Sequence, residues 1–140
     1  MIRITSNPAI VDRIVNHPAV RPTIQAGTER LHSRGLLERK GVICYVDEDE
    51  TAAALFVPTG PQALEGHICA LPTSRGAKVL GFGAAAIHAV RQRSSARFLV
   101  AQVPMPLRAA RFLCRRLGFT AQPRDLADMA DNVERFVMEI

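Results

Sequence analysis

The sequence predicts a single domain of mixed α/β class, with a mostly antiparallel central sheet flanked by helices. A chain of 140 residues is long enough for one domain with a sizeable core, and no linker or repeat divides it. Residues 41–71 contain three short apolar runs separated by turn residues, which is typical of an antiparallel meander. Strand and helix patterns then alternate, which favours a sheet with helices packed on it.

The chain begins with a predicted strand and helix. Apolar and polar residues alternate over residues 1–5, as in a half-buried strand. Ser6 or Asn7 can cap a helix that has Pro8 near its first turn. The predicted apolar face of this helix consists of Ile10, Val11, Ile14 and Val15. His17 precedes a proline, which disfavours the helical region, so the helix is expected to end there.

The next segment is harder to interpret. Apolar residues are scattered over residues 19–40, and we predict a second, irregular helix at about residues 21–33. Three strands follow, at residues 41–47, 51–57 and 64–71. An acidic turn joins the first two, and a Pro-Thr-Gly-Pro stretch is expected to end the second.

The second half of the chain alternates between helix and strand. Residues 75–93 have a helical apolar face, and residues 97–103 form the nearly continuous apolar run of a central strand. A helix at residues 107–117 should end at Gly118, and residues 132–140 should form a last strand. The predicted order is β-α-α-β-β-β-α-β-α-β.

Composition narrows the function classes. Eighteen basic residues against 13 acidic ones give a net charge of +5, which suits either a solvated basic surface or attraction to polyanions. No helix-turn-helix, zinc-finger or aromatic RNA-binding pattern is present, so nucleic acid is not indicated as a partner. Three cysteines far apart in sequence argue against a disulfide framework and against a metal site.

The sequence also bears on location. No apolar run approaches the roughly 20 residues of a membrane span, so no membrane partner is expected. Residues 1–5 lack the apolar core of a signal peptide, which favours a cytoplasmic protein.

Residues 68–119 carry the most specific pattern. A short apolar strand runs into Pro72-Thr73-Ser74-Arg75-Gly76-Ala77-Lys78, and then come an Ala-rich helix, a second strand and a basic helix ending in Leu117-Gly118-Phe119. This order resembles the central half of a GNAT-superfamily acetyltransferase, where the corresponding elements form the acyl-CoA site. The resemblance implies a GNAT fold, acetyl-CoA as substrate and transfer of its acetyl group to a primary amine. It also implies that the sheet splays open near residues 69–71 and 101–103.

The turn after the first of these strands departs from the family pattern Arg/Gln-x-x-Gly-x-Gly/Ala. Counted from Arg75, the glycine positions hold Lys78 and Leu80, whereas counting from Lys78 supplies both glycines after the wrong first residue. Backbone N–H groups at a helix start favour anions, although the turn could equally be a plain strand-to-helix connection. The implied cofactor-binding residues are Cys69, Ala70, Leu71, Arg75, Gly76, Ala77, Lys78, Val79 and Leu80.

Three residues are implied as catalytic. Many family members have an acid on the fourth strand, where Glu65 lies here, and His67 follows on the same strand face. Histidine is the side chain that titrates nearest neutral pH, which favours His67 as a base. Either Glu65 or His67 could serve as the base, or both could be ordinary strand residues. Aligned on Gly118 and Phe119, Cys114 replaces the tyrosine that commonly protonates the departing thiolate. This thiol could donate a proton or simply pack.

Two functions therefore stay open. The first is N-acetylation of an unknown primary amine. The second is a catalytically weak or inactive GNAT scaffold with a binding or structural role, for example in a phage virion, because short phage-encoded GNAT-like proteins also lose these glycines. A protein partner or homo-oligomer would suit the second. Arg108, Arg111 and Arg115 lie on one helical stripe, which is either a solvated face or a contact for the CoA 3′-phosphate or an acidic partner.

Overall fold

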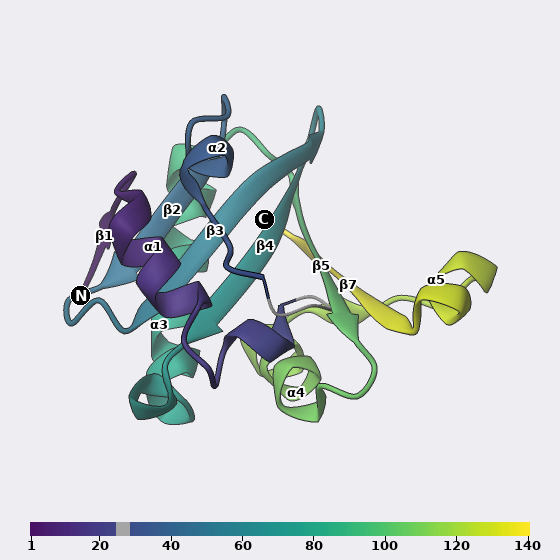
Figure 1. The fold of residues 1–140 in the computed structure, drawn as a ribbon. Helices are drawn as coiled ribbons and strands as arrows, with labels where there is room; N and C mark the ends of the chain where they lie inside the picture. Colours follow the sequence, from purple (N-terminus) through teal and green to yellow (C-terminus); the bar gives the residue numbers. More distant parts are fainter. Residues whose placement is uncertain (25–28) are drawn as a thin grey trace.

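The computed structural model describes residues 1–24 and 29–140, which form a seven-stranded sheet of order β1-β2-β3-β4-β5-β7-β6 (Figure 1). The strands are β1 (Ile2–Ile4), β2 (Ile43–Asp47), β3 (Ala52–Gly60), β4 (Ala63–Ala70), β5 (Phe98–Pro104), β6 (Thr120–Ala121) and β7 (Val133–Glu139). The helices are α1 (Pro8–Val15), α2 (Arg34–Leu37), α3 (Ala77–Arg93), α4 (Arg108–Leu117) and α5 (Leu126–Asp131), with 3₁₀ turns η1 (Arg21–Thr23) and η2 (Pro72–Ser74). Only β4 and β5 pair in parallel among the described strands, so the predicted mixed, mostly antiparallel sheet is confirmed.

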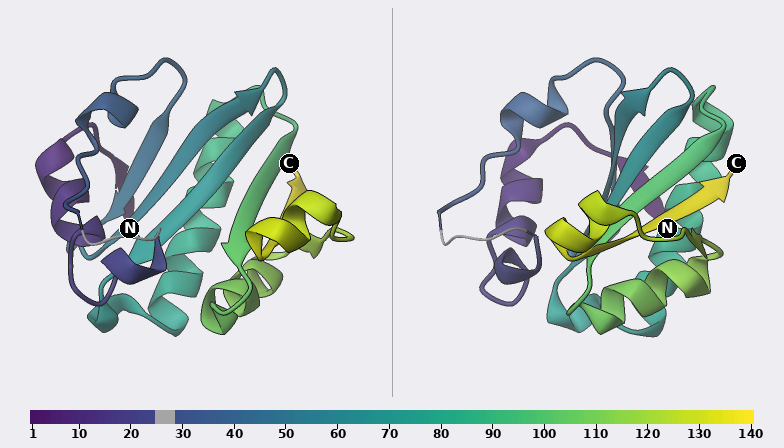
Figure 2. Two further views of the ribbon diagram at one scale, coloured as in Figure 1. Left: turned by 45° about the vertical axis from the view of Figure 1, so that its right-hand side comes forward. Right: turned by 90° about the vertical axis from the view of Figure 1, so that its right-hand side faces the viewer.

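Helices cover both faces of this sheet. The apolar face of α1 packs on one side, against β2 and β3 residues that include Cys44, Val46 and Leu55. On the other side α3 buries Val79, Phe82 and four further residues, and α4 lies beside it. The right-hand view of Figure 2 shows α1 and α3 on opposite sides of the strands. None of the described helices is long and apolar enough to cross a membrane.

The start of α1 follows the prediction, but the segment after it does not. The Asn7 side chain accepts the Ala9 N–H at 3.0 Å and so caps the helix. In place of the helix predicted at residues 21–33, the structure has only the short η1, and residues 25–28 of that prediction lie outside the described residues. The Asn16 side chain takes over both backbone groups of Leu31, with its Oδ1 accepting the N–H at 2.7 Å and its Nδ2 donating to the carbonyl at 2.8 Å. This pairing holds residue 31 outside a helix.

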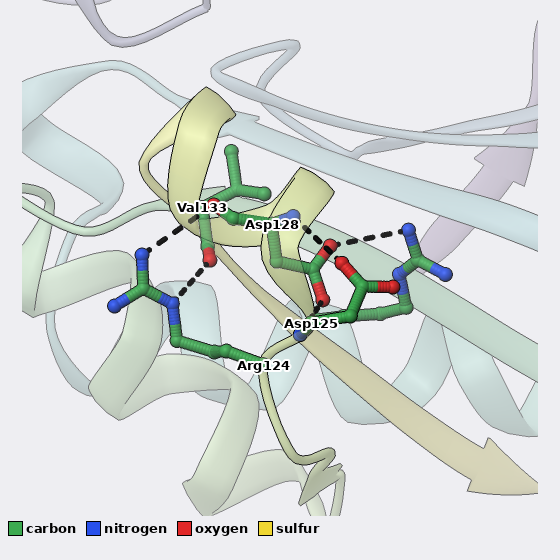
Figure 3. Close-up of polar contacts among 5 residues, drawn as sticks. Arg124, Asp125, Asp128 and Val133 are labelled. Carbon is green, nitrogen blue, oxygen red and sulfur yellow. Dashed lines mark hydrogen bonds and ion pairs between the residues drawn. The ribbon is translucent and has the colours of Figure 1, made fainter.

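Two further differences concern strands and helices near turns. β3 continues to Gly60 with a register shift after Pro58, so the prolines do not end it where the sequence predicted. β6 and α5 were not predicted, and α5 projects beyond the sheet (Figure 1). Asp125 and Asp128 cap each other's backbone at the start of α5 (Figure 3). Arg135 also donates to the buried Asp128 carboxylate at 3.3 Å.

Gly83 sets the distance between α3 and its neighbours. A Cβ atom at this position would lie 3.1 Å from Ile68 Cδ1 on β4 and 3.1 Å from Leu117 Cδ1 on α4. The lack of a side chain at Gly83 therefore lets α3 approach the sheet and α4 closely. A Cβ atom at Gly81 would have no such neighbour within 4 Å, so this second glycine does not bring α3 closer to the sheet.

Candidate functional site

The sheet opens between β4 and β5. Their parallel pairing runs from Ala63 opposite Phe98 to Glu65 opposite Val100 and ends there. Further along, β4 pairs only with β3, and β5 only with β7, among the described residues. The predicted splay near residues 69–71 and 101–103 is thus confirmed.

Backbone groups of β4 face this opening. The Leu71 N–H donates to Thr51 O on the β3 side at 2.8 Å. Because hydrogen-bonding direction alternates along a strand, the N–H and C=O groups of Gly66, Ile68 and Ala70 point the other way, toward β5. The Glu65–Val100 pairing still uses the Gly66 N–H, so the groups that border the opening are the Gly66 carbonyl and the N–H and C=O groups of Ile68 and Ala70, which form a short strand edge inside the molecule.

Two pockets meet at the opening. The first, of about 390 Å³, passes between the strands and is lined on one side by α1 together with residues 23–24, 31–33 and 36, and on the other by α4. The second, of about 800 Å³, lies between the end of β4, the start of α3 and α4. Both volumes are typical of small-molecule sites. The pockets share the residues Thr23, Ile68, Cys69, Leu107, Ala110 and Leu113.

The second pocket contains a helix start suited to anions. Gly76 precedes α3 with φ +79°, a conformation that favours glycine, and no side chain caps the helix. Leu80 N–H makes the first helical bond to Gly76 O, so the N–H groups before it are open to a ligand. Of the predicted cofactor residues, Cys69, Ala70, Arg75, Gly76, Ala77, Val79 and Leu80 line this pocket, whereas Leu71 and Lys78 do not.

Three arginines line the second pocket among the described residues, and only one of them is bonded to backbone carbonyls there. The Arg75 guanidinium donates to Ala19 O at 2.7 Å and to Ala70 O at 3.3 Å, so it ties the end of β4 to the loop after α1. Arg108 and Arg116 of α4 line the pocket wall. Arg116 was not singled out from the sequence, since its position opposite the α3 start depends on how α4 packs.

The predicted arginine stripe on α4 is divided between two roles. Arg111 and Arg115 approach the Glu134 carboxylate on β7, at 3.8 and 3.0 Å, and Arg115 also lies 5.3 Å from the Phe136 ring centre. Only Arg108 of the three lines the second pocket. Two of these cations therefore have a partner within the protein.

Glu65 and His67 lie together, as their spacing predicted. His67 Nε2 is 3.3 Å from Glu65 Oε1, and the His67 and Glu65 side chains are 50% and 24% exposed, respectively. Cys69 packs on the α1 face of the sheet, and alternation along β4 puts Glu65 and His67 on that face too. His67 lines the first pocket, and Gln102 lines it from β5. The pair is thus a candidate proton acceptor beside the opening.

The thiols near the opening are weak acids. Cys114 lines the first pocket and packs against Ala101, Val103 and Phe136. Burial raises the pKa of Cys114 to about 11; the Arg115 charge lowers this pKa and the Glu134 charge raises it. Burial likewise raises the pKa of Cys69 to about 11. All three cysteines are free, and the described residues contain no group of three metal ligands.

Comparison with known proteins identifies the fold. No family model matches the sequence, and no curated protein does. Several solved structures do match. The ribosomal-protein-alanine N-acetyltransferase of Brucella melitensis has 20% identity and a TM-score of 0.74, covering 100% of this chain and 98% of that one. The spermidine N-acetyltransferase SpeG of Vibrio cholerae, as its F149G mutant, has 11% identity and a TM-score of 0.74, covering 99% and 92%.

A third match contains a ligand. The Campylobacter jejuni N-acetyltransferase PseH, in complex with acetyl coenzyme A, has 18% identity and a TM-score of 0.59, covering 76% of this chain and 73% of that one. The seven-stranded sheet, its opening between β4 and β5 and these matches define an α/β domain with the fold of these N-acetyltransferase structures. The chain has the GNAT fold.

Proposed function

We propose that this protein transfers an acetyl group from acetyl-CoA to a primary amine. The observation that carries the proposal is the opening between β4 and β5, where the two pockets meet. The second pocket contains a helix start suited to phosphates, and the first contains His67 in contact with Glu65. An acyl donor and an amine entering from the two pockets would meet beside Ile68 and Cys69.

The residues of the second pocket suit acetyl-CoA as substrate. The first N–H groups of α3 and the guanidinium groups of Arg108 and Arg116 favour its phosphates. The strand edge formed by Ile68 and Ala70 offers amide partners to the pantetheine arm, as an edge does to an added strand. PseH binds acetyl coenzyme A on the same fold.

The chemistry assigned to this chain is mostly positioning. Glu65 and His67 take the proton that the amine loses, and the neutral nitrogen attacks the thioester carbonyl. A C–N bond forms, the C–S bond breaks, and CoA leaves as a thiolate that takes up the proton released by the newly bonded nitrogen. The raised pKa of Cys114 makes it a weaker acid than an ordinary thiol, which favours packing over proton donation for this residue.

The alternative function is a binding or structural scaffold. Its support consists of the displaced glycines, the cysteine at the tyrosine position and Leu107 at the position of the family's asparagine, and the matched acetyltransferase structures add none. A cytoplasmic location stays the sequence-based prediction, with a virion as its alternative.

A thermal-shift titration tests the substrate assignment. Acetyl-CoA at 100 times its dissociation constant should stabilise the protein by about 2.7 kcal/mol. ATP at the same concentration is the control for general anion binding. Equal shifts with both ligands, or no shift with acetyl-CoA, would contradict the proposal.

A further inference from the structure

We infer that the acceptor is a primary amine with an apolar body and no second cationic group. This inference rests on the proposed acetyl transfer and concerns the first pocket, which would receive the acceptor. It follows from the side chains that line that pocket and from the location of the nearest carboxylates.

The wall of the first pocket that faces α1 is aliphatic. It is formed by Val11, Val15, Ile24, Leu31, Leu36 and Leu55, which come from α1, the segment before β2, and β3. Such a wall stabilises an alkyl or aryl group through burial of apolar surface. It offers no hydrogen-bonding partner to a polar end of the acceptor.

Few polar side chains line this pocket, and most are engaged. Thr23 Oγ1 donates to Val20 O at 2.6 Å, and Ser33 Oγ approaches Pro8 O at 3.5 Å. His32, His67 and Gln102 are the other polar lining residues among those described. None of these groups carries the negative charge that a buried ammonium requires.

The described residues that line the first pocket include no Asp, Glu, Lys or Arg. Residues 25–28, Gln-Ala-Gly-Thr, also lack charge in the sequence. Two described carboxylates contact residues of the lining. Glu65 is paired with His67 at the reacting end, and Asp12 accepts the Ser33 N–H at 2.8 Å.

One carboxylate therefore serves the reacting amine, and none in the described lining serves another. A second ammonium in the aliphatic part would lose its hydration without gaining a partner, which is strongly unfavourable. The pocket thus selects against diamines and polyamines. In this respect its lining disfavours spermidine, the amine named for the Vibrio cholerae protein of the same fold.

The test compares two amines of equal chain length. Heptylamine and 1,6-diaminohexane differ in having a methyl or an ammonium group at the far end. With acetyl-CoA and release of free CoA thiol as readout, kcat/KM should be about 100-fold or more higher for heptylamine. A diamine used as well as or better than heptylamine would overturn the inference and leave acetyl transfer intact.

Absence of turnover with both amines, together with no acetyl-CoA binding in calorimetry, would instead reject the proposed function and the inference with it. Binding of acetyl-CoA without turnover of either amine would reject the inferred class of acceptor, although the protein would still bind acetyl-CoA.

A matched pair of variants isolates the charge. Leu36 is only partly buried, and Leu36→Glu adds a carboxylate to the aliphatic wall while Leu36→Gln adds the same shape without charge. The preference for heptylamine should shrink about tenfold more in the Glu variant than in the Gln variant. Equal preferences in the two variants would contradict the inference. If the variants do not fold, the comparison of amines with the parent protein decides.

Discussion

At the scale of single residues, Cys114 illustrates how position in a site differs from a role in its chemistry. It occupies the place of a family tyrosine and lines the first pocket, but it packs against Ala101, Val103 and Phe136. Cys114→Ala should therefore lower the free energy of unfolding by about 1 kcal/mol and leave kcat nearly unchanged. Melting temperatures and steady-state rates on one amine decide this. A rate loss of roughly 10²-fold or more at an unchanged melting temperature would show that the thiol is a proton donor.

For Glu65 and His67 we expect the opposite, a loss of activity without a loss of stability. His67 is half exposed, so His67→Gln should keep the melting temperature and reduce kcat by roughly 10² to 10⁴-fold. His88→Gln is the matched control, because His88 lies on α3 in contact with Gln92 and lines neither pocket.

The two members of this pair should also be coupled. If Glu65 acts through His67, Glu65→Gln should add little further rate loss to the His67 variant. Fully additive losses in a double-mutant cycle would show that the two side chains act independently.

At the scale of elements, Arg75 and Lys78 at the start of α3 have different roles, although the sequence predicted both as cofactor-binding residues. Arg75→Ala should lower the melting temperature, because the guanidinium bonds to Ala19 O and Ala70 O are lost. Lys78 is exposed and outside the pocket lining, so Lys78→Ala should keep stability and weaken CoA binding modestly, and only at low salt. Calorimetry at two salt concentrations measures this difference.

Arg91, at the far end of α3, provides the control variant Arg91→Ala, which should alter neither quantity. Combined Arg108→Ala and Arg116→Ala changes should weaken CoA binding more than Lys78→Ala does, since these side chains line the pocket. A larger effect at Lys78 would contradict this assignment of the phosphate contacts.

The elements with a buried face were predictable from the sequence, whereas those held by polar groups were not. The apolar spacing of Val11, Ile14 and Val15 predicts α1, and the run of β5 predicts a central strand. In α5, Leu126 is 85% exposed and the helix depends on Asp125, Asp128 and Arg135, so no apolar period marks it.

The site divides in the same way. Glu65, His67 and most residues of the α3 start were predicted from the resemblance to the family pattern along one strand and one turn. Arg116 and Gln102 could not be found by that means, because they reach the pockets through the packing of α4 and β5 against distant elements. The first pocket also depends on residues 31–36, where the Asn16 side chain holds the backbone of Leu31.

At the scale of the whole molecule, the turn between β2 and β3 links stability to pH. Burial alone would raise the pKa of Asp47, but hydrogen bonds from Thr51 Oγ1 and from the N–H groups of Ala52 and Thr51 lower it below the usual 3.8. A depressed pKa means that the ionised carboxylate stabilises the fold above that usual value and that this stability is lost as the pH falls through the lower folded-state pKa.

Asp47→Asn should therefore reduce the urea midpoint at pH 7, and the gap to the parent should narrow as the pH falls below about 3.8. Glu48→Gln in the same turn is the control. A gap that is constant between about pH 7 and about pH 2.5 would show that the loss is one of shape rather than of charge.

The strand edge on β4 has a kinetic consequence for the backbone itself. The N–H groups of Ile68 and Ala70 face the opening, while the neighbouring N–H groups of His67 and Cys69 face β3. Amide exchange with deuterated water should thus be fast at every second residue of one strand. Acetyl-CoA, lying along this edge, should slow exchange at those alternate positions and leave the others as they were. Because the site is an unpaired strand edge, bound acetyl-CoA would be detected as protection from exchange at every second residue of β4.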